Sequence, residues 1–310
     1  MNPELQKILA RQHYAIVGSH SGVKLCHWMK QSLLFGRECY KQTFYGISSH
    51  RCLQMTPAVT HCTHMCLFCW RFQNFTEKEL RDYDEPGYIL EHAIEAQKKL
   101  LTGFKGDPRC DQKKWKEANQ PNMLACSLSG EPTLYPKLGE FFGLCRQKGI
   151  TTFLVTNGTT PEALAKLDTL PTQLFVSVVA PTEEVYKKIC APLVPNGWDK
   201  IQETLSLLPS LDTRTVIRHT LVHGWNMDEK YIEAYAKLDA KASPMFIEPK
   251  GFVFVGSSRN RLHFSNMPTH DQVKTFGQKL ADKLGYDQSN EKADSLVVLL
   301  SSQQKNKKVK

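Results

Sequence analysis

The chain has 310 residues, of which 41% are hydrophobic, and a formal net charge of +9. It is long enough to bury a sizeable core, and it has neither a run of 18 apolar residues nor an apolar signal segment after Met1, which argues against membrane insertion and secretion. We therefore expect a soluble, cytoplasmic monomer with no membrane partner, in which cysteines serve metal binding or catalysis rather than form disulfides. The positive charge favours a polyanionic partner such as nucleic acid.

The first part of the chain contains three widely spaced cysteines, Cys26, Cys39 and Cys52, with 12 residues between neighbours. This spacing is too wide for one tight loop, so the connecting pieces must fold back if the thiols are to meet. Taken alone, the three could equally be small core residues or zinc ligands. Aromatic and basic neighbours, such as Lys41 and Tyr45, are unusual beside a purely structural clip and favour a functional site.

A more specific pattern follows at Cys62, Cys66 and Cys69, which have three and then two residues between them. Thiolates prefer soft metals, and three of them in a short loop can hold a four-iron cluster while one iron keeps an open position. Such an iron can bind a substrate or a cofactor. The aromatic Phe68 before the last cysteine fits this interpretation. The alternatives are a structural zinc knot, which usually needs four ligands, and a chance grouping of buried cysteines.

The middle of the chain alternates between strands and helices. We predict helices at 88–104, 138–148, 161–168, 183–190, 198–208 and 229–238, and strands at 123–128, 151–156, 174–179, 214–222 and 245–248. This repetition predicts an α/β fold with a parallel sheet curled into a full or partial (β/α) barrel, with ligands at the carboxyl ends of its strands. The expected divisions are an N-terminal cysteine-rich extension at 1–54, a barrel core at 55–290, a terminal strand at 291–300 and a basic disordered tail at 301–310.

Polar residues stand at or near the ends of these strands. Gly130 lets a backbone approach a bound ligand closely, and Glu131 can face an ammonium group, although a plain strand-to-helix turn is the alternative. Asn157 suits a ribose or a carboxylate, or it starts an Asn-Gly turn. Arg218 lies inside a strand and points either inward to a carboxylate or outward to solvent.

The other cysteines and the basic residues receive simpler interpretations. We predict that Cys110, Cys126, Cys145 and Cys190 are small core residues and that the scattered histidines are structural. Basic residues interleaved with Trp115 suit contact with unpaired RNA bases, although solvated faces would look the same for each single residue. They are Lys98, Lys99, Lys105, Arg109, Lys113, Lys114, Lys116, Arg259 and Arg261.

The run from Cys62 to Cys69 resembles the radical S-adenosylmethionine (SAM) superfamily, in which the open iron of a [4Fe-4S] cluster binds SAM and an electron cleaves it to a radical. The wide cysteine triad, Cys39-Tyr-Lys41 and Ser127-Leu-Ser-Gly-Glu-Pro-Thr-Leu-Tyr135 resemble the 4-demethylwyosine synthase family, which comprises lyases of wybutosine-type tRNA modification. The resemblance runs from about Cys26 to Gly256. One departure is the strand 175–179, after which a relative can carry Asp; here no acidic residue follows, and no catalytic acid is assigned there.

The resemblance implies two [4Fe-4S] clusters, one on Cys62, Cys66 and Cys69 and a second on Cys26, Cys39 and Cys52. With the cluster in place, we expect the residues that contact the SAM cofactor to be Phe68, Gly130, Glu131, Asn157 and Arg218. The resemblance also implies that N1-methylguanosine beside the anticodon of phenylalanine tRNA is condensed with pyruvate, which the second cluster is thought to hold, to form a tricyclic base.

Lys41 lies two residues from Cys39, and its amine is expected to form a Schiff base with the pyruvate ketone, the alternative being a surface lysine near a turn. Larger relatives can carry a flavin-binding segment, whereas only 25 residues precede Cys26 here, so we expect an external low-potential electron donor. The competing functions are a non-catalytic zinc or iron-sulfur RNA-binding protein and another radical SAM activity on tRNA, such as methylthiolation.

Overall fold

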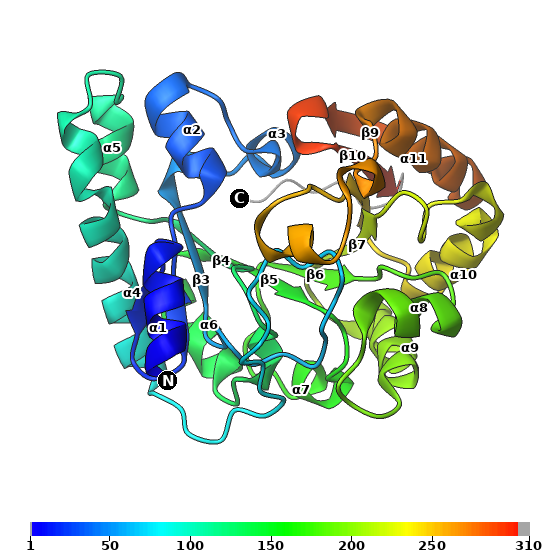
Figure 1. The fold of residues 1–310 in the computed structure, drawn as a ribbon, viewed down its shortest axis with the longest axis horizontal. Helices are drawn as coiled ribbons and strands as arrows, with labels where there is room; N and C mark the ends of the chain where they lie inside the picture. Colours follow the sequence, from blue (N-terminus) through cyan, green and yellow to red (C-terminus); the bar gives the residue numbers. More distant parts are fainter. Residues whose placement is uncertain (1, 303–310) are drawn as a thin grey trace.

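The computed structural model describes residues 2–302, so the expected tail lies outside the described residues except for its first two, which belong to the last strand. Ten strands form one mixed sheet in the order β1-β2-β3-β4-β5-β6-β7-β8-β10-β9 (Figure 1). The strands are β1 (Ala15–Val17), β2 (Ser21–Val23), β3 (Cys52–Thr56), β4 (Met123–Cys126), β5 (Thr151–Thr156), β6 (Gln173–Ser177), β7 (Arg214–Leu221), β8 (Phe246–Gly251), β9 (Tyr286–Lys292) and β10 (Val297–Ser302).

Eleven α-helices accompany the sheet within the described residues. They are α1 (Pro3–Arg11), α2 (His27–Phe35), α3 (Tyr40–Tyr45), α4 (Pro86–Leu101), α5 (Gln112–Ala118), α6 (Leu138–Gln147), α7 (Pro161–Ala165), α8 (Glu183–Cys190), α9 (Gly197–Leu207), α10 (Ile232–Ala242) and α11 (His270–Leu284). Across residues 2–302 none of the helices is both long and apolar enough to cross a membrane.

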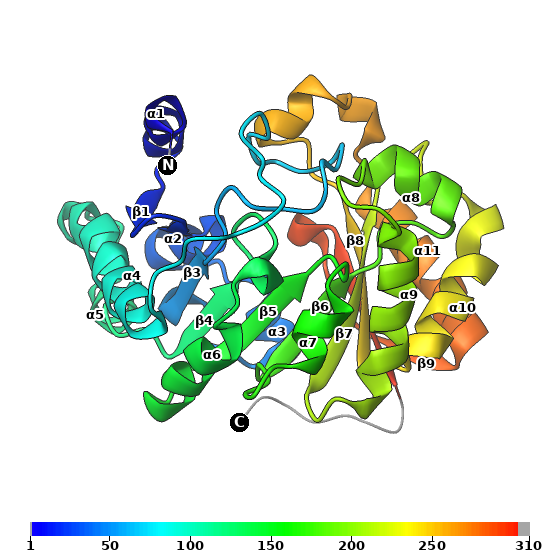
Figure 2. The ribbon, with the colours of Figure 1, turned by 90° about the horizontal axis from the view of Figure 1, so that it is seen from below.

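The six strands from β3 to β8 are parallel neighbours, and helices follow most of them on the outer side (Figure 2). Antiparallel strands extend both edges, with β2 beside β3 and β10 beside β8. The expected α/β fold is confirmed as a partial barrel, because β1 and β9 end the strand order instead of pairing with each other. The boundary expected at residue 54 falls inside β3, so the cysteine-rich segment is continuous with the sheet.

Two elements near the C-terminus differ from the sequence prediction. The terminal strand expected at 291–300 is instead the end of β9 and most of β10, because the chain turns at Ala293–Ser295 and Leu296 adopts a positive φ of 48°. Helix α11 was not singled out by the alternating pattern. A capping box between Thr269 and Gln272 starts it, and its apolar stripe packs against the sheet.

Helix α3 fills the inner side of the barrel. Tyr45 is fully buried, and its ring centroid lies 6.1 Å from that of Phe153, 6.0 Å from Phe175 and 5.5 Å from Phe246, which project from β5, β6 and β8. The Tyr45 hydroxyl donates a 2.6 Å hydrogen bond to Glu248. Edge-to-face aromatic packing of this kind stabilises a buried position beyond the area it removes from water. It therefore carries the start of α3, and with it Lys41, into the barrel.

Candidate active site

The six cysteines singled out from the sequence line two cavities inside the barrel. The outer cavity, of about 380 Å³, is lined by Cys62, Cys66 and Cys69. The inner cavity, of about 180 Å³, is lined by the triad of Cys26, Cys39 and Cys52. Ser127 and Arg218 line both cavities, so the two are neighbours that share a wall.

The outer cysteine loop is held by the end of helix α8. The amide of Met65 donates to the carbonyl of Cys190 at 3.1 Å, and the amide of Leu67 donates to that of Ile189 at 2.9 Å. The last carbonyls of a helix have no partner within the helix, so the loop satisfies acceptors that would otherwise be left open. The guanidinium of Arg261 binds the carbonyls of Leu67 and Cys69 on the other side. The loop is thus fixed at both flanks.

Cys62 and Cys66 lie where the protonated thiol is favoured unless a cation binds the sulfur. Burial raises the pKa of the Cys62 thiol to about 12, and a hydrogen bond with Cys190, together with burial, raises the pKa of Cys66. A thiolate at such a buried position needs a cation beside it. The Asn157 side-chain amide also donates to the Cys62 sulfur at 3.9 Å. Soft donors with a hydrogen-bonded sulfur fit the expected [4Fe-4S] cluster.

Gly130 and Glu131 line the outer cavity, but packing and hydrogen bonds within the protein also account for both residues. Gly130 has φ of +69°, and a Cβ atom there would lie 1.7 Å from the carbonyl oxygen of Ala58, so close backbone packing already requires glycine. The buried Glu131 accepts hydrogen bonds from the Thr133 hydroxyl at 2.6 Å and from the backbone amide of Asn157 at 2.7 Å. Burial raises the pKa of this carboxyl group. Contact of these residues with SAM stays a prediction.

Phe68 and Arg218 complete the set expected around SAM. Phe68 lines the outer cavity beside the cysteines. Arg218 points inward to a carboxylate, since its guanidinium lies 2.7 Å from Glu248 and donates to the Tyr40 hydroxyl at 2.8 Å. The sequence left the direction of this side chain open, and in the structure it faces Glu248 of β8 and Tyr40 of α3.

Lys41 lies in the inner cavity and is only 8% exposed, so the alternative of a surface lysine is wrong. Its amine lies 4.8 Å from the ring centroid of Phe175 and 5.3 Å from that of Phe153. Burial, reinforced by the charge of Arg218, lowers the pKa of the amine. The chemical role of Lys41 stays a prediction.

Lys250 is a residue of the site that sequence reasoning missed. It lies on β8, lines the outer cavity, and its amine is 5.1 Å from the ring centroid of Tyr40 and 2.5 Å from the Ser295 carbonyl. Burial and the neighbouring Arg218 lower its pKa to about 8. The alternation of Phe246, Glu248 and Lys250 on one strand was the available signal, because alternate residues share a face.

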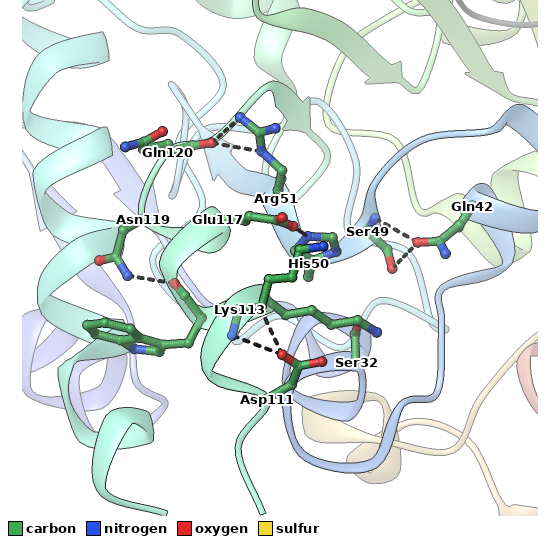
Figure 3. Close-up of polar contacts among 12 residues, drawn as sticks. Ser32, Gln42, Ser49, His50, Arg51, Asp111, Lys113, Glu117, Asn119 and Gln120 are labelled. Carbon is green, nitrogen blue, oxygen red and sulfur yellow. Dashed lines mark hydrogen bonds and ion pairs between the residues drawn. The ribbon is translucent and has the colours of Figure 1, made fainter.

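A polar network on helix α5 braces the segment just before Cys52 (Figure 3). His50 lies 2.6 Å from Glu117, and the Arg51 guanidinium donates twice to the Gln120 carbonyl, at 2.8 and 3.0 Å. Trp115 of the same helix donates its indole N–H to the Leu101 carbonyl at 2.9 Å. The Trp115 ring is half-buried and contact with RNA stays a prediction, while α5 supports the inner site.

The remaining four cysteines are buried, and none of the ten cysteines forms a disulfide. Cys126 and Cys145 lie in the main core, as predicted. Cys190 also packs in that core, but it lies close to His64 and Cys66, which the sequence did not indicate.

Two family models match the chain. The one described as "Radical SAM superfamily" covers residues 57–235, and the one described as "Wyosine base formation" covers residues 241–302. The chain is 52% identical to the S-adenosyl-L-methionine-dependent tRNA 4-demethylwyosine synthase of Pyrococcus horikoshii, over 97% of this chain and 89% of that protein. It is 43% identical to the corresponding TYW1 protein of Mus musculus, over 92% of this chain but 39% of that longer protein.

Two solved structures match over the whole chain. "Structure of TYW1 with a lysine-pyruvate adduct bound" has a TM-score of 0.89 at 37% identity and is covered over 98% of its length. "Crystal structure of archaeal TYW1" has a TM-score of 0.81 at 33% identity with the same coverage. The family resemblance seen in the sequence is confirmed. The chain belongs to the tRNA 4-demethylwyosine synthase family and is a radical SAM enzyme that modifies tRNA, with SAM and a [4Fe-4S] cluster as cofactors.

Proposed function

We propose that this chain, acting as a monomer in the cytoplasm, condenses pyruvate with N1-methylguanosine of phenylalanine tRNA to form a tricyclic base. The observation that carries the proposal is a buried lysine, Lys41, in a cavity that shares a wall with the outer cavity. A relative at 37% identity has been solved with a lysine-pyruvate adduct, which supports this choice of substrate.

The second [4Fe-4S] cluster would be held by Cys26, Cys39 and Cys52. Burial raises the pKa of the Cys39 thiol to about 12 and that of Cys52 further, so thiolates there also need a cation. When bound, the outer cluster supplies the electron that cleaves SAM to a radical. The residues of the chain have the remaining tasks of binding pyruvate, holding it near the outer cavity and keeping water away.

The charges around the inner cavity favour an anionic substrate. Lys41 is buried, Arg218 and Lys250 are half-buried, and Glu248 is the carboxylate that lies among these three cations and pairs with Arg218. A buried excess of positive charge is unfavourable until anions neutralise it. Thiolates at the inner cysteines and the carboxylate of pyruvate would supply that negative charge.

Lys41 has the position for a covalent task. Its amine nitrogen forms a bond to the ketone carbon of pyruvate, and the ketone oxygen leaves as water, which gives a Schiff base. The carboxylate is then oriented by Arg218 and Lys250. After the SAM-derived radical takes a hydrogen atom from the methyl group of N1-methylguanosine, that methyl carbon would bond to the former ketone carbon. The bond from this carbon to the carboxyl group would break, and the one-carbon fragment would carry off the unpaired electron. Exchange of the lysine nitrogen for the exocyclic guanine nitrogen would then close the ring and restore the amine.

The segment after β8 supports RNA binding at the mouth of the outer cavity. Val253 and Val255 line the cavity, and the nearby Phe264 is 69% exposed. The Phe264 ring lies edge-on to Phe254, over which the guanidinium of Arg259 lies at 5.4 Å. Exposed rings interleaved with cations suit stacking on unpaired anticodon-loop bases.

Reductive trapping tests the proposal. Labelled pyruvate and borohydride should attach one label to Lys41 in the native enzyme, while the peptide with Lys250 serves as an internal control and stays unlabelled. Lys41→Ala should keep its iron and uncoupled SAM cleavage but make no tricyclic base. Normal product from Lys41→Ala, or label on another lysine, would overturn the assignment.

The electron that reduces the outer cluster comes, in our proposal, from a separate low-potential donor. The purified enzyme should turn over with a strong chemical reductant and remain inactive with NADPH alone. Turnover with NADPH as sole reductant would contradict this.

A further inference from the structure

Arg71 is a buried arginine in the wall of the outer cavity and has no part in the reaction described so far. It follows Cys69 by two residues, lines the cavity together with it, and is 4% exposed. Its Nε and Nη2 atoms are buried and have no hydrogen-bond partner within the described residues. Buried N–H groups are normally paired, because leaving them without an acceptor costs free energy. These two groups therefore indicate an acceptor that the protein itself does not supply.

The third nitrogen of the guanidinium fixes the side chain. Nη1 donates to the Thr76 hydroxyl at 2.9 Å, and that hydroxyl donates in turn to the Gln73 carbonyl at 2.7 Å. The side-chain amide of Gln73 donates to the Cys66 carbonyl at 3.1 Å, which ties the same segment to the cysteine loop. Arg71 is thus anchored next to the loop through Nη1, and its Nε and Nη2 groups are left for another acceptor.

The edge formed by Nε and Nη2 is the part of a guanidinium that receives a carboxylate with two parallel hydrogen bonds. Other arginines of the chain use it in this way. Arg109 donates from Nε and Nη2 to the two oxygens of Asp107, at 2.9 and 2.6 Å. Arg218 directs the same two nitrogens to Glu248, at 2.8 and 2.7 Å. Arg71 has the same edge but pairs with no carboxylate within residues 2–302.

The charges that line the outer cavity match the amino-acid end of SAM. That end is a zwitterion, with one carboxylate and one ammonium group. Glu131 is the carboxylate among the lining residues and suits the ammonium group. Arg218 and Lys250 also line the cavity, but each already donates to an acceptor of the protein. Arg71 is therefore the lining cation that remains for the SAM carboxylate.

We propose that Arg71 binds the carboxylate of SAM through its Nε and Nη2 groups. The proposal rests on the assignment of Cys62, Cys66 and Cys69 to the cluster that holds SAM, because Arg71 lies next to that loop. Arg71 contacts the cofactor rather than pyruvate, since it lines the outer cavity and not the inner one. A phosphate of the tRNA is the competing anion.

Binding to the anaerobically reconstituted enzyme without a reductant tests the proposal, because SAM is then not consumed. The two probes are SAM and decarboxylated SAM, which lacks only the carboxylate, and equilibrium dialysis measures both affinities. Arg71→Gln should weaken SAM binding about 10- to 100-fold and the binding of decarboxylated SAM less than about twofold, because only SAM has the charged partner. Arg71→Lys keeps the charge without the two-pronged edge and should give an intermediate affinity for SAM. Arg81→Gln removes a guanidinium that is 83% exposed and should change neither affinity.

Three other results would overturn the proposal. The first is an unchanged SAM affinity in Arg71→Gln. The second is equal weakening of both probes, which would show that Arg71 acts by holding the loop. The third is weaker tRNA binding with unchanged SAM binding, which would assign Arg71 to an RNA phosphate.

Iron content and the visible spectrum of each variant separate cofactor binding from cluster loss. If Arg71→Gln loses iron, Arg71→Lys decides, since it keeps a cation beside the loop and still discriminates the two probes less than the native enzyme does. Equal discrimination by Arg71→Lys and the native enzyme would then contradict the proposal. A native enzyme without an outer [4Fe-4S] signal would instead refute the cluster assignment itself.

Discussion

The two cavities are built in opposite ways, although each is lined by three cysteines. The outer cavity takes its thiols from one eight-residue run, and the end of α8 and Arg261 hold that run in place. The inner cavity takes its thiols from three separate places, before α2, before α3 and at the start of β3. Those thiols line one cavity because the segments that carry them fold back together, with α3 packed inside the barrel. A local motif can therefore be recognised from its spacing alone, whereas the wide spacing of the inner triad left zinc ligands and core residues open as alternatives.

The largest effect should come from breaking one ligand set at a time. Cys66→Ala should abolish SAM cleavage and leave the inner cluster in place, whereas Cys39→Ala should keep uncoupled SAM cleavage and abolish product. Iron analysis should give about four irons per chain in each variant against about eight in the native enzyme, since each set holds its own four-iron cluster. Complete loss of iron in either variant would show that the two sites are not independent.

The next largest effect is expected from substitutions of Tyr45, which should disturb the inner cavity more than the outer one. Tyr45→Ala should lower the free energy of unfolding by about 3–5 kcal/mol, because it leaves a large gap among Phe153, Phe175 and Phe246. The inner cluster should be lost before the outer one. Tyr45→Phe is the matched control, since it keeps the ring and removes only the hydrogen bond to Glu248. Denaturant unfolding and iron content measure both effects, and equal loss from the two cavities would contradict the role given to α3.

A smaller effect is expected at Lys250, which faces the boundary between the cavities. Lys250→Gln should raise KM for pyruvate about tenfold, equivalent to about 1.4 kcal/mol, because one cation facing the carboxylate is removed. SAM cleavage without pyruvate should be nearly unchanged. Lys250→Arg keeps the charge and should recover part of the affinity. An unchanged KM in Lys250→Gln would restrict pyruvate binding to Lys41 and Arg218.

The smallest effect concerns the mouth of the outer cavity. Phe264→Ala should weaken tRNA binding by about 1 kcal/mol, roughly fivefold, through the loss of one stacked base. Tyr88→Ala removes another exposed ring, 44% exposed on α4 and stacked on His92, and should leave binding unchanged. Filter binding or anisotropy at fixed salt would measure both. Equal losses in the two variants would argue against a specific stacking site.

Much of the sheet was predictable from the sequence because its strands and helices have strong local signals. The expected ranges at 151–156 and 183–190 coincide with β5 and α8, and the other helix and strand predictions in the middle of the chain overlap observed elements. Fully buried strands that alternate with helices are compatible with few other secondary-structure assignments. The outer cysteine loop and the polar residues after β4 and β5 were also predicted because their signals are local in the sequence.

The inner site was predicted only in part because its geometry depends on contacts between distant segments. Alternation along β7 limited Arg218 to two directions, and the partners that hold it on the inner side, Glu248 and Tyr40, come from distant parts of the chain. Lys250 and Cys190 belong to no short motif; each contacts the site through a partner at least 120 residues away in the chain, namely Tyr40 and Cys66. Such pairs carry no spacing signal in a single sequence.

Strand β3 sets the distance between Cys52 and the outer cysteine loop. Cys52 begins it, and the loop with Cys62 comes after its last residue, Thr56, so the strand lies between Cys52 and the outer cysteine loop in the chain. Five strand residues span roughly 17 Å, and successive side chains point to opposite faces. An insertion of one residue in β3 would lengthen the distance between Cys52 and the outer cysteine loop. It would also turn the Cys52 side chain to the opposite face of the sheet. Substitutions on the outer face of β3 should thus be tolerated where insertions and deletions are not.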